Sequence, residues 1–197
     1  MRTTARLAAA ALSTTLVVGA TATSAFAQSD TIKDKSSDVL SFADQTTDTR
    51  GTQLGSAESV ASGVDLRSLK VEHGTKNVTV KLTFSNLADT TTAYVGFRVD
   101  GKTRPSRVFI NTSDKKGIIT NVKGDKKCSV NVKHRYGTRG TITATFKRSC
   151  LGTPKRLKAS AFAADPGYFG DNTAYKADAV SKNTVRGQAY TKWLKAS

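Results

Sequence analysis

The sequence predicts an all-β protein, an antiparallel β-sandwich of the Ig-like or jelly-roll-like kind with one disulfide. The first reason is strict alternation in NVTVKLTF, residues 77–84, where every second residue is apolar, as in a strand with one buried face. Similar alternation recurs at 69–71, 95–99 and 108–110, and no stretch of helical length shows apolar residues at three- and four-residue spacing. The second reason is turn chemistry, because Asp100-Gly101 separates two such runs as in a hairpin. Roughly seven to ten short strands are expected from this spacing.

The first 27 residues are expected to be a cleaved secretory signal peptide. Arg2 and Arg6 give a basic start, residues 7–20 form an apolar run, and Ala25-Phe26-Ala27 is a small-x-small cleavage site. The apolar run is shorter than the roughly 18–20 residues that a membrane-spanning helix needs. We therefore predict a secreted, extracellular protein with no membrane span.

The remaining chain is predicted to be one domain with short extensions. Residues 28–35 are expected to be a flexible N-terminus, residues 36–180 the β-sandwich domain, and residues 181–197 a basic C-terminal tail. An early strand is expected near 37–43, followed by a loop rich in Ser, Thr, Asp and Gly.

The segment between the only two cysteines, Cys128 and Cys150, is predicted to be a β-hairpin whose strands are joined by a disulfide. In an exported chain two cysteines are expected to pair. If they face each other directly, Val132 faces Phe146 and the hairpin loop runs over residues 137–141. The apolar residues of both strands and the cysteines all stand at even positions, so the disulfide and the hydrophobic pattern agree. The outward side is then a flat surface faced with Thr and Lys, formed by Asn131, Lys133, Thr143, Thr145 and Lys147.

The charge is distributed unevenly along the chain. Residues 28–66 hold seven acidic and three basic residues, net −4, whereas residues 67–197 hold eight acidic and twenty-six basic residues, net +18. This asymmetry favours an anionic partner, with solubility alone as the alternative. Aromatic residues for stacking are sparse in the basic region, with Tyr136 the clear candidate, so sequence-specific recognition of nucleic acid is not expected. The candidate polyanion-binding residues are Lys126, Lys127, Lys133, Arg135, Arg139 and Lys147.

Known catalytic patterns are not found in the sequence. It contains no Gly-x-Ser-x-Gly elbow and no zinc helix, and a disulfide would occupy both thiols. His73 is expected at the end of a strand beside Gly74, as a turn residue, and His134 shares the inward positions of its strand. The sequence therefore predicts a protein that is not an enzyme.

A calcium site is a further hypothesis, since no other cofactor is indicated. The loops at sandwich edges can bind Ca²⁺ through carboxylates. Acidic residues are spaced along the early segment at Asp34, Asp38, Asp44 and Asp48, and recur near the C-terminus at Asp165, Asp171 and Asp178. The candidate ligands are Asp38, Asp44 and Asp178. The alternative is that these acids are simply solvated.

Three stretches carry a resemblance to a known group of proteins. They are GVDLRSLKV at 63–71, NVTVKLTFSNL at 77–87, and Cys150-Leu151-Gly152-Thr153-Pro154. Across residues 36–163 the chain resembles small secreted actinobacterial β-sandwich proteins of uncharacterised function. It is also similar to carbohydrate-binding-module-like (family 9 and DOMON-like) sandwiches, in which an early acidic segment precedes the strand pair. The resemblance implies a sandwich fold and no particular ligand.

The predicted function is that of a secreted, non-catalytic binding or surface-associated module. It would engage anionic polymers of the cell envelope or environment, such as an anionic polysaccharide or another polyanion. The alternative is a small extracellular hydrolase or enzyme inhibitor with an unrecognised site. A concave cleft with convergent polar groups and shifted pKa values would favour the alternative, and a flat basic sheet would favour binding.

Overall fold

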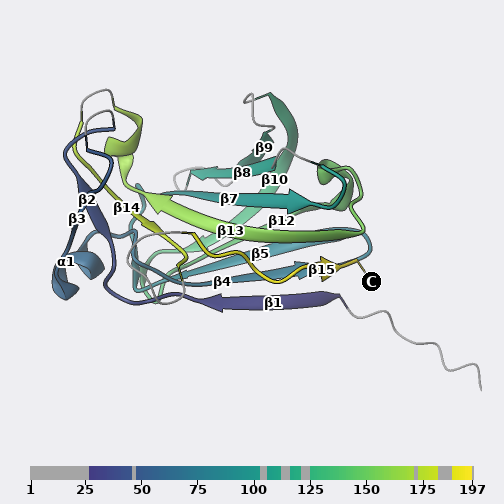
Figure 1. The fold of residues 1–197 in the computed structure, drawn as a ribbon, viewed down its shortest axis with the longest axis horizontal. Helices are drawn as coiled ribbons and strands as arrows, with labels where there is room; N and C mark the ends of the chain where they lie inside the picture. Colours follow the sequence, from purple (N-terminus) through teal and green to yellow (C-terminus); the bar gives the residue numbers. More distant parts are fainter. Residues whose placement is uncertain are drawn as a thin grey trace, which may run out of the picture.

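The computed structural model describes residues 27–45, 48–102, 106–111, 116–120, 125–170, 173–181 and 188–196. The predicted signal peptide, residues 1–27, lies outside this part of the chain except for Ala27. The described residues form a mostly antiparallel β structure with a 13-stranded sheet in the order β1-β4-β5-β12-β10-β9-β8-β7-β13-β14-β2-β3, and β15 pairs with β13 (Figure 1). A small second sheet pairs β11 with β6.

The strands are β1 (Gln28–Lys33), β2 (Leu40–Phe42), β3 (Thr52–Gln53), β4 (Leu66–His73), β5 (Asn77–Phe84), β6 (Asn86–Leu87), β7 (Thr92–Val99), β8 (Ser106–Asn111), β9 (Lys116–Thr120), β10 (Lys126–Arg135), β11 (Gly137–Thr138), β12 (Thr141–Lys147), β13 (Arg156–Ala164), β14 (Tyr175–Ala179) and β15 (Leu194–Lys195). The helical elements in the described chain are α1 (Ser56–Ala61) and two 3-10 turns, η1 (Arg148–Leu151) and η2 (Pro166–Phe169). The strands outnumber the seven to ten predicted, partly because several are only two residues long.

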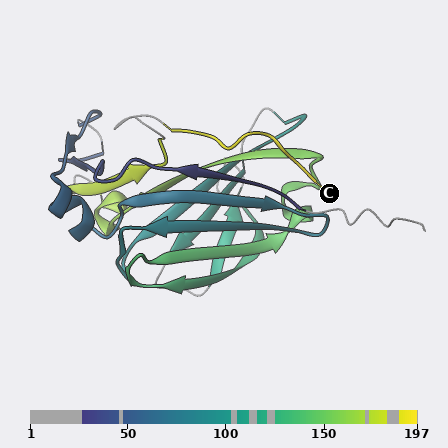
Figure 2. The ribbon, with the colours of Figure 1, turned by 90° about the horizontal axis from the view of Figure 1, so that it is seen from below.

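The large sheet curls so that its two halves enclose one core. Phe97 of β7 packs edge-on against Phe146 of β12, with ring centroids 5.6 Å apart, although β10, β9 and β8 separate these strands in the sheet. Seen from below, β1, β4, β5 and β12 run side by side across the molecule (Figure 2). The alternation read in residues 77–84 is confirmed, because all four apolar side chains of β5 are buried. The prediction of an all-β antiparallel fold with one disulfide is therefore confirmed, while the Ig-like or jelly-roll-like assignment stays a prediction.

Both ends of the described chain are built into the sheet, which corrects the boundaries predicted from the sequence. Residues 28–35 are not a free extension, because β1 pairs with β4 along its whole length and buries Ile32. The C-terminal segment is also docked: Leu194 is buried, and Thr191 exchanges hydrogen bonds with the backbone of Ala159. Figure 1 shows β15 between β13 and β1. Isolated apolar residues among polar neighbours anchor both segments, and a pattern this short does not predict a strand.

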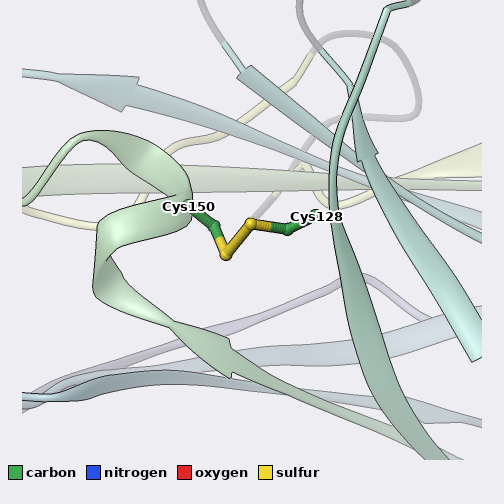
Figure 3. Close-up of a disulfide and its surroundings, with 2 residues drawn as sticks. All are labelled: Cys128 and Cys150. Carbon is green, nitrogen blue, oxygen red and sulfur yellow. A yellow bond between two sulfur atoms is a disulfide. The ribbon is translucent and has the colours of Figure 1, made fainter.

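The disulfide between Cys128 and Cys150 is confirmed, but the predicted hairpin register is wrong by two residues. Val132 of β10 pairs with Ala144 of β12, not with Phe146. The reason is that β12 ends at Lys147 and Cys150 lies beyond it in η1, as Figure 3 shows. A shift of two keeps every side chain on its face, so the predicted inward and outward sets are unchanged.

The early strand predicted near 37–43 is present as the shorter β2, but the loop predicted after it contains α1. This helix is one and a half turns long, and its only large apolar residue, Val60, is exposed. It therefore has no amphipathic pattern that could have indicated it.

Candidate functional site

The outer face of β10, β12, β5 and β4 carries mainly Thr and Lys, the residue types predicted for the outward side of its first two strands. One cross-strand row consists of Lys133, Thr143, Lys81 and Lys70. The neighbouring row contains Thr145 and Thr79, whose hydroxyl oxygens lie 3.3 Å apart. We call this surface the flat face.

The predicted polyanion-binding residues whose side chains the structure describes are exposed, and they are spread along β10, the turn that follows it and β12. Lys133 and Lys147 both lie on the flat face, and Lys126 lies at the start of β10. Arg135 is partly engaged, because its Nη2 donates a 2.6 Å hydrogen bond to the carbonyl oxygen of Arg139. The side chain of Lys127 lies outside the described residues. Together these side chains give a spread of positive charge and not a site.

A concave site lies on the outer face of the other half of the sheet, over β8, β7 and β13. Cross-strand pairing places Phe109, Tyr94 and Phe162 in one row. The next row holds Arg107, Gly96 and Ser160, and its two small residues leave a hollow beside the rings. The hollow, which we call the aromatic pocket, has a volume of about 480 Å³. Its described lining residues are Tyr94, Gly96, Arg107, Ser160, Phe162, Tyr168, Ala179, Gln188 and Tyr190.

The rings of the pocket belong to a larger aromatic cluster. The ring centroid of Tyr94 lies 5.1 Å from that of Phe109 and 6.0 Å from those of Phe162 and Tyr168. Tyr168 comes from η2, where Asp165 accepts a hydrogen bond from the backbone N–H of Gly167 and fixes the turn. Aromatic residues were predicted to be sparse in the basic stretch between Lys115 and Lys158. The rings of this cluster come from elements outside that stretch, and those on strands meet here because the strands pair in the sheet. The sequence signal that could have indicated this aromatic cluster is the outward position of Tyr94 in a strand of alternating pattern.

Polar groups converge on the same pocket. The Ser160 side chain is 1% exposed, and its hydroxyl oxygen has no hydrogen-bond partner among the described residues. Burial, followed by the neighbouring Tyr168, raises the pKa of Tyr94, so its phenol stays neutral and can donate a hydrogen bond. Arg107 supplies an exposed guanidinium at the rim.

The docked C-terminal segment adds one wall and further positive charge. The Tyr190 ring lies 4.9 Å from the guanidinium carbon of Arg98 and 5.2 Å from Nζ of Lys158. Trp193, next along the segment, lies 5.2 Å from the same Lys158 nitrogen and 5.6 Å from the Arg156 guanidinium carbon. Cations placed over ring faces are held by the ring quadrupole, so this wall is both aromatic and basic.

A separate group of carboxylates is buried at the end of the sheet where β1, β2, β4 and β14 meet. Asp34, Asp38 and Asp178 each offer an oxygen, and these three oxygens lie within 4.8 Å of one another. Two predicted calcium candidates, Asp38 and Asp178, therefore come together, whereas Asp44 lies outside the group. Asp34, which follows β1 directly, completes it. We call these three residues the aspartate cluster.

Burial and mutual repulsion disfavour the charged forms of these carboxyls. Burial first, then the neighbouring carboxylates, raises the pKa of Asp178 to about 9 and that of Asp38 to about 6. The pKa of Asp34 is also raised, mainly by burial. Among the described residues, no Lys or Arg forms an ion pair with any of the three.

The two histidines occupy structural positions. His73 is the last residue of β4, the strand end at which it was predicted. It is fully buried and its Nδ1 lies 3.0 Å from the carbonyl oxygen of Leu194, so it is a core residue and not a turn residue. The half-buried His134 ring lies against Tyr136, with centroids 4.6 Å apart. Neither histidine lines the aromatic pocket among its described residues.

The chain matches no protein-family model, and comparison with curated proteins and with solved structures gave no match. The resemblance to secreted actinobacterial and carbohydrate-binding-module-like sandwiches thus stays a prediction. None of the described helices is long and apolar enough to cross a membrane.

Proposed function

We propose that this protein is a secreted, non-catalytic module that binds an anionic polysaccharide, with one acidic sugar unit seated in the aromatic pocket. The observation that carries the proposal is the row of rings lying directly beside Arg107 and the Ser160 hydroxyl in one hollow. Ligand sites are typically concave and mostly apolar, with a few placed polar groups that set orientation.

The chemistry of the pocket suits a sugar acid. The faces of Tyr94 and Phe162 can cover the apolar C–H face of a sugar ring. The Arg107 guanidinium can pair with a carboxylate or sulfate through two parallel hydrogen bonds. The Ser160 hydroxyl, which is buried without a partner in the described structure, gains one from a sugar hydroxyl.

The flat face has a different part in this proposal. Its lysines are spread over four strands, so they attract a polyanion over a distance without selecting a particular sugar. That attraction is screened by salt, whereas pairing inside the pocket is screened less. The two surfaces can therefore be separated experimentally.

Binding is favoured over the alternative of a hydrolase because of what lines the pocket. The described lining residues include no Asp, Glu, His or Cys, and glycoside hydrolysis usually needs two carboxyl groups across the scissile bond. The carboxyls with raised pKa values belong to the aspartate cluster, which shares no described residue with the pocket.

The test is calorimetric titration with defined oligosaccharides of uronic acids and of neutral sugars at 50 mM and 300 mM salt. We expect binding of the acidic series at both salt concentrations. Gly96→Val should abolish it, because the new side chain projects into the hollow from an extended strand, with its Cβ 3.4 Å from the Ser160 oxygen. Arg107→Gln should weaken binding at least about tenfold, as expected for the loss of a charge-assisted hydrogen bond.

Lys133→Gln is the matched control, since it removes the same charge from the flat face. It should change the affinity less than threefold at 300 mM salt. If Lys133→Gln and Arg107→Gln weaken binding equally, or if Gly96→Val binds like the wild type, the pocket is not the site.

A further inference from the structure

We propose that Asp34, Asp38 and Asp178 form a Ca²⁺ site that ties the two ends of the chain together. This inference is independent of the proposed polysaccharide binding, because it concerns different residues at a different end of the sheet. The three carboxylates come from the residue after β1, the turn before β2, and β14.

The spacing of the oxygen atoms fits one ion. Ca²⁺ holds its oxygen ligands at about 2.3–2.6 Å, so two ligands on opposite sides are roughly 4.6–5.2 Å apart. The three cluster oxygens lie within 4.8 Å of one another. They can therefore contact one central ion with little movement of the backbone.

Two buried carboxylate oxygens lack the donor that a buried acceptor requires. Asp38 is 1% exposed, and its Oδ1 has no hydrogen-bond partner among the described residues. Asp34 is 9% exposed, and its Oδ2 also has no hydrogen-bond partner among them. The opposite oxygens do have donors. Asp34 Oδ1 accepts from the backbone N–H groups of Lys35 and Ser181, and the single hydroxyl proton of Ser181 is shared between Asp34 Oδ1 and Asp38 Oδ2. The free oxygens are thus the ones available to a ligand, and leaving them unpaired would be costly.

The remaining contacts hold the carboxylates in place. The backbone N–H of Ser181 donates to Asp34 Oδ1 at 2.8 Å, and the N–H of Leu66 donates to Asp178 Oδ2 at 2.6 Å. Asp65, beside the cluster, accepts from the N–H of Ser37 and from the hydroxyl of Ser85. These donors are all neutral, so no described side chain brings a positive charge to the cluster.

The donor set selects the ion. Carboxylate oxygens without sulfur or imidazole suit hard cations such as Ca²⁺ and Mg²⁺. Mg²⁺ usually keeps several of its waters and binds through one or two carboxylates, whereas Ca²⁺ accepts more protein oxygens in looser geometry. Three buried carboxylates at one point therefore favour Ca²⁺.

The test is calcium binding by the purified protein after dialysis against EDTA. Isothermal titration with CaCl₂ should give one site per chain with a Kd at or below about 1 mM, within the range of extracellular calcium modules. The melting temperature should rise in 5 mM CaCl₂. Asp38→Asn should weaken the binding at least tenfold, whereas Asp44→Asn, which removes a carboxylate outside the cluster, should leave both readouts unchanged.

A folding control keeps the test decisive. In EDTA, Asp38→Asn should melt no lower than the wild type, because it removes one of several buried like charges and keeps the side-chain shape. Its melting temperature should then no longer respond to CaCl₂. Absence of binding by the wild type at 10 mM CaCl₂, or an undiminished calcium response in folded Asp38→Asn, would overturn the site. An equal response to MgCl₂ would overturn its assignment to Ca²⁺.

Discussion

Replacing both cysteines by alanine is the perturbation whose energetic cost follows most directly from the structure. Cys128 and Cys150 are 22 positions apart in the sequence. In the chain-entropy model, closing a loop of about this length removes roughly 11 cal/mol/K from the unfolded chain, which corresponds to about 3 kcal/mol at room temperature. Both cysteines also pack against the core, but alanine retains part of that contact. We expect the double variant to lose about 2–4 kcal/mol.

Urea unfolding followed by circular dichroism measures this loss, with free-thiol titration of the denatured, unreduced wild type as the companion measurement. The wild type should show no reactive thiol. The acidic-sugar affinity should change little while the variant remains folded, because neither cysteine lines the aromatic pocket among its described residues. A loss below about 1 kcal/mol would show that the bridge does not constrain the unfolded chain as this reasoning requires.

Three further predictions concern the docked C-terminal segment, a buried histidine and an exposed ion pair. Leu194→Ala should cost about 2–5 kcal/mol in urea unfolding, since Leu194 is 1% exposed; a cost near zero would show that the segment is not docked. The pKa of His73 is lowered, mainly by burial. As the pH falls, the unfolded state therefore takes up a proton on His73 before the folded state does. Below about pH 6.5 the free energy of unfolding of the wild type should fall by at most roughly 1.4 kcal/mol per pH unit more than that of His73→Asn. Parallel pH profiles for the two proteins would refute this. Glu72→Gln, which removes the exposed ion pair with Lys70, should change the stability by less than about 1 kcal/mol, and a larger change would show a coupled network.

The fold class could be predicted from the sequence because period-two alternation is a local signal. Val78, Val80 and Leu82 mark β5 without any knowledge of its neighbours, and all three are buried. The hairpin register could not be predicted in the same way. Alternation fixes which face a residue occupies but not which partner it meets, so a shift of two residues leaves the pattern intact.

The candidate sites were harder to predict because they assemble residues that are distant in the sequence. Asp38 and Asp178 were named as candidate calcium ligands, whereas Asp34 was noted only as one of the acids of the early segment, since nothing local shows that the chain after β1 returns to β14. Likewise, Tyr94 and Phe162 are unremarkable in their own strands. They become neighbours only because β7 pairs with β13.

The fold shows where the acidic residues of the first part of the sequence and the basic residues of the second part lie. The acidic segment, residues 28–66, holds seven acids, but two of them belong to the buried aspartate cluster and a third, Asp65, is also buried beside it. Burial raises the pKa values of Asp34 and Asp38, so these two acids offset the lysines and arginines less than their formal charges imply. A bound Ca²⁺ would neutralise them further without touching either basic surface. The outer surface is thus more positive than the net charge of the chain implies, which favours attraction of an anionic polymer toward both the flat face and the aromatic pocket.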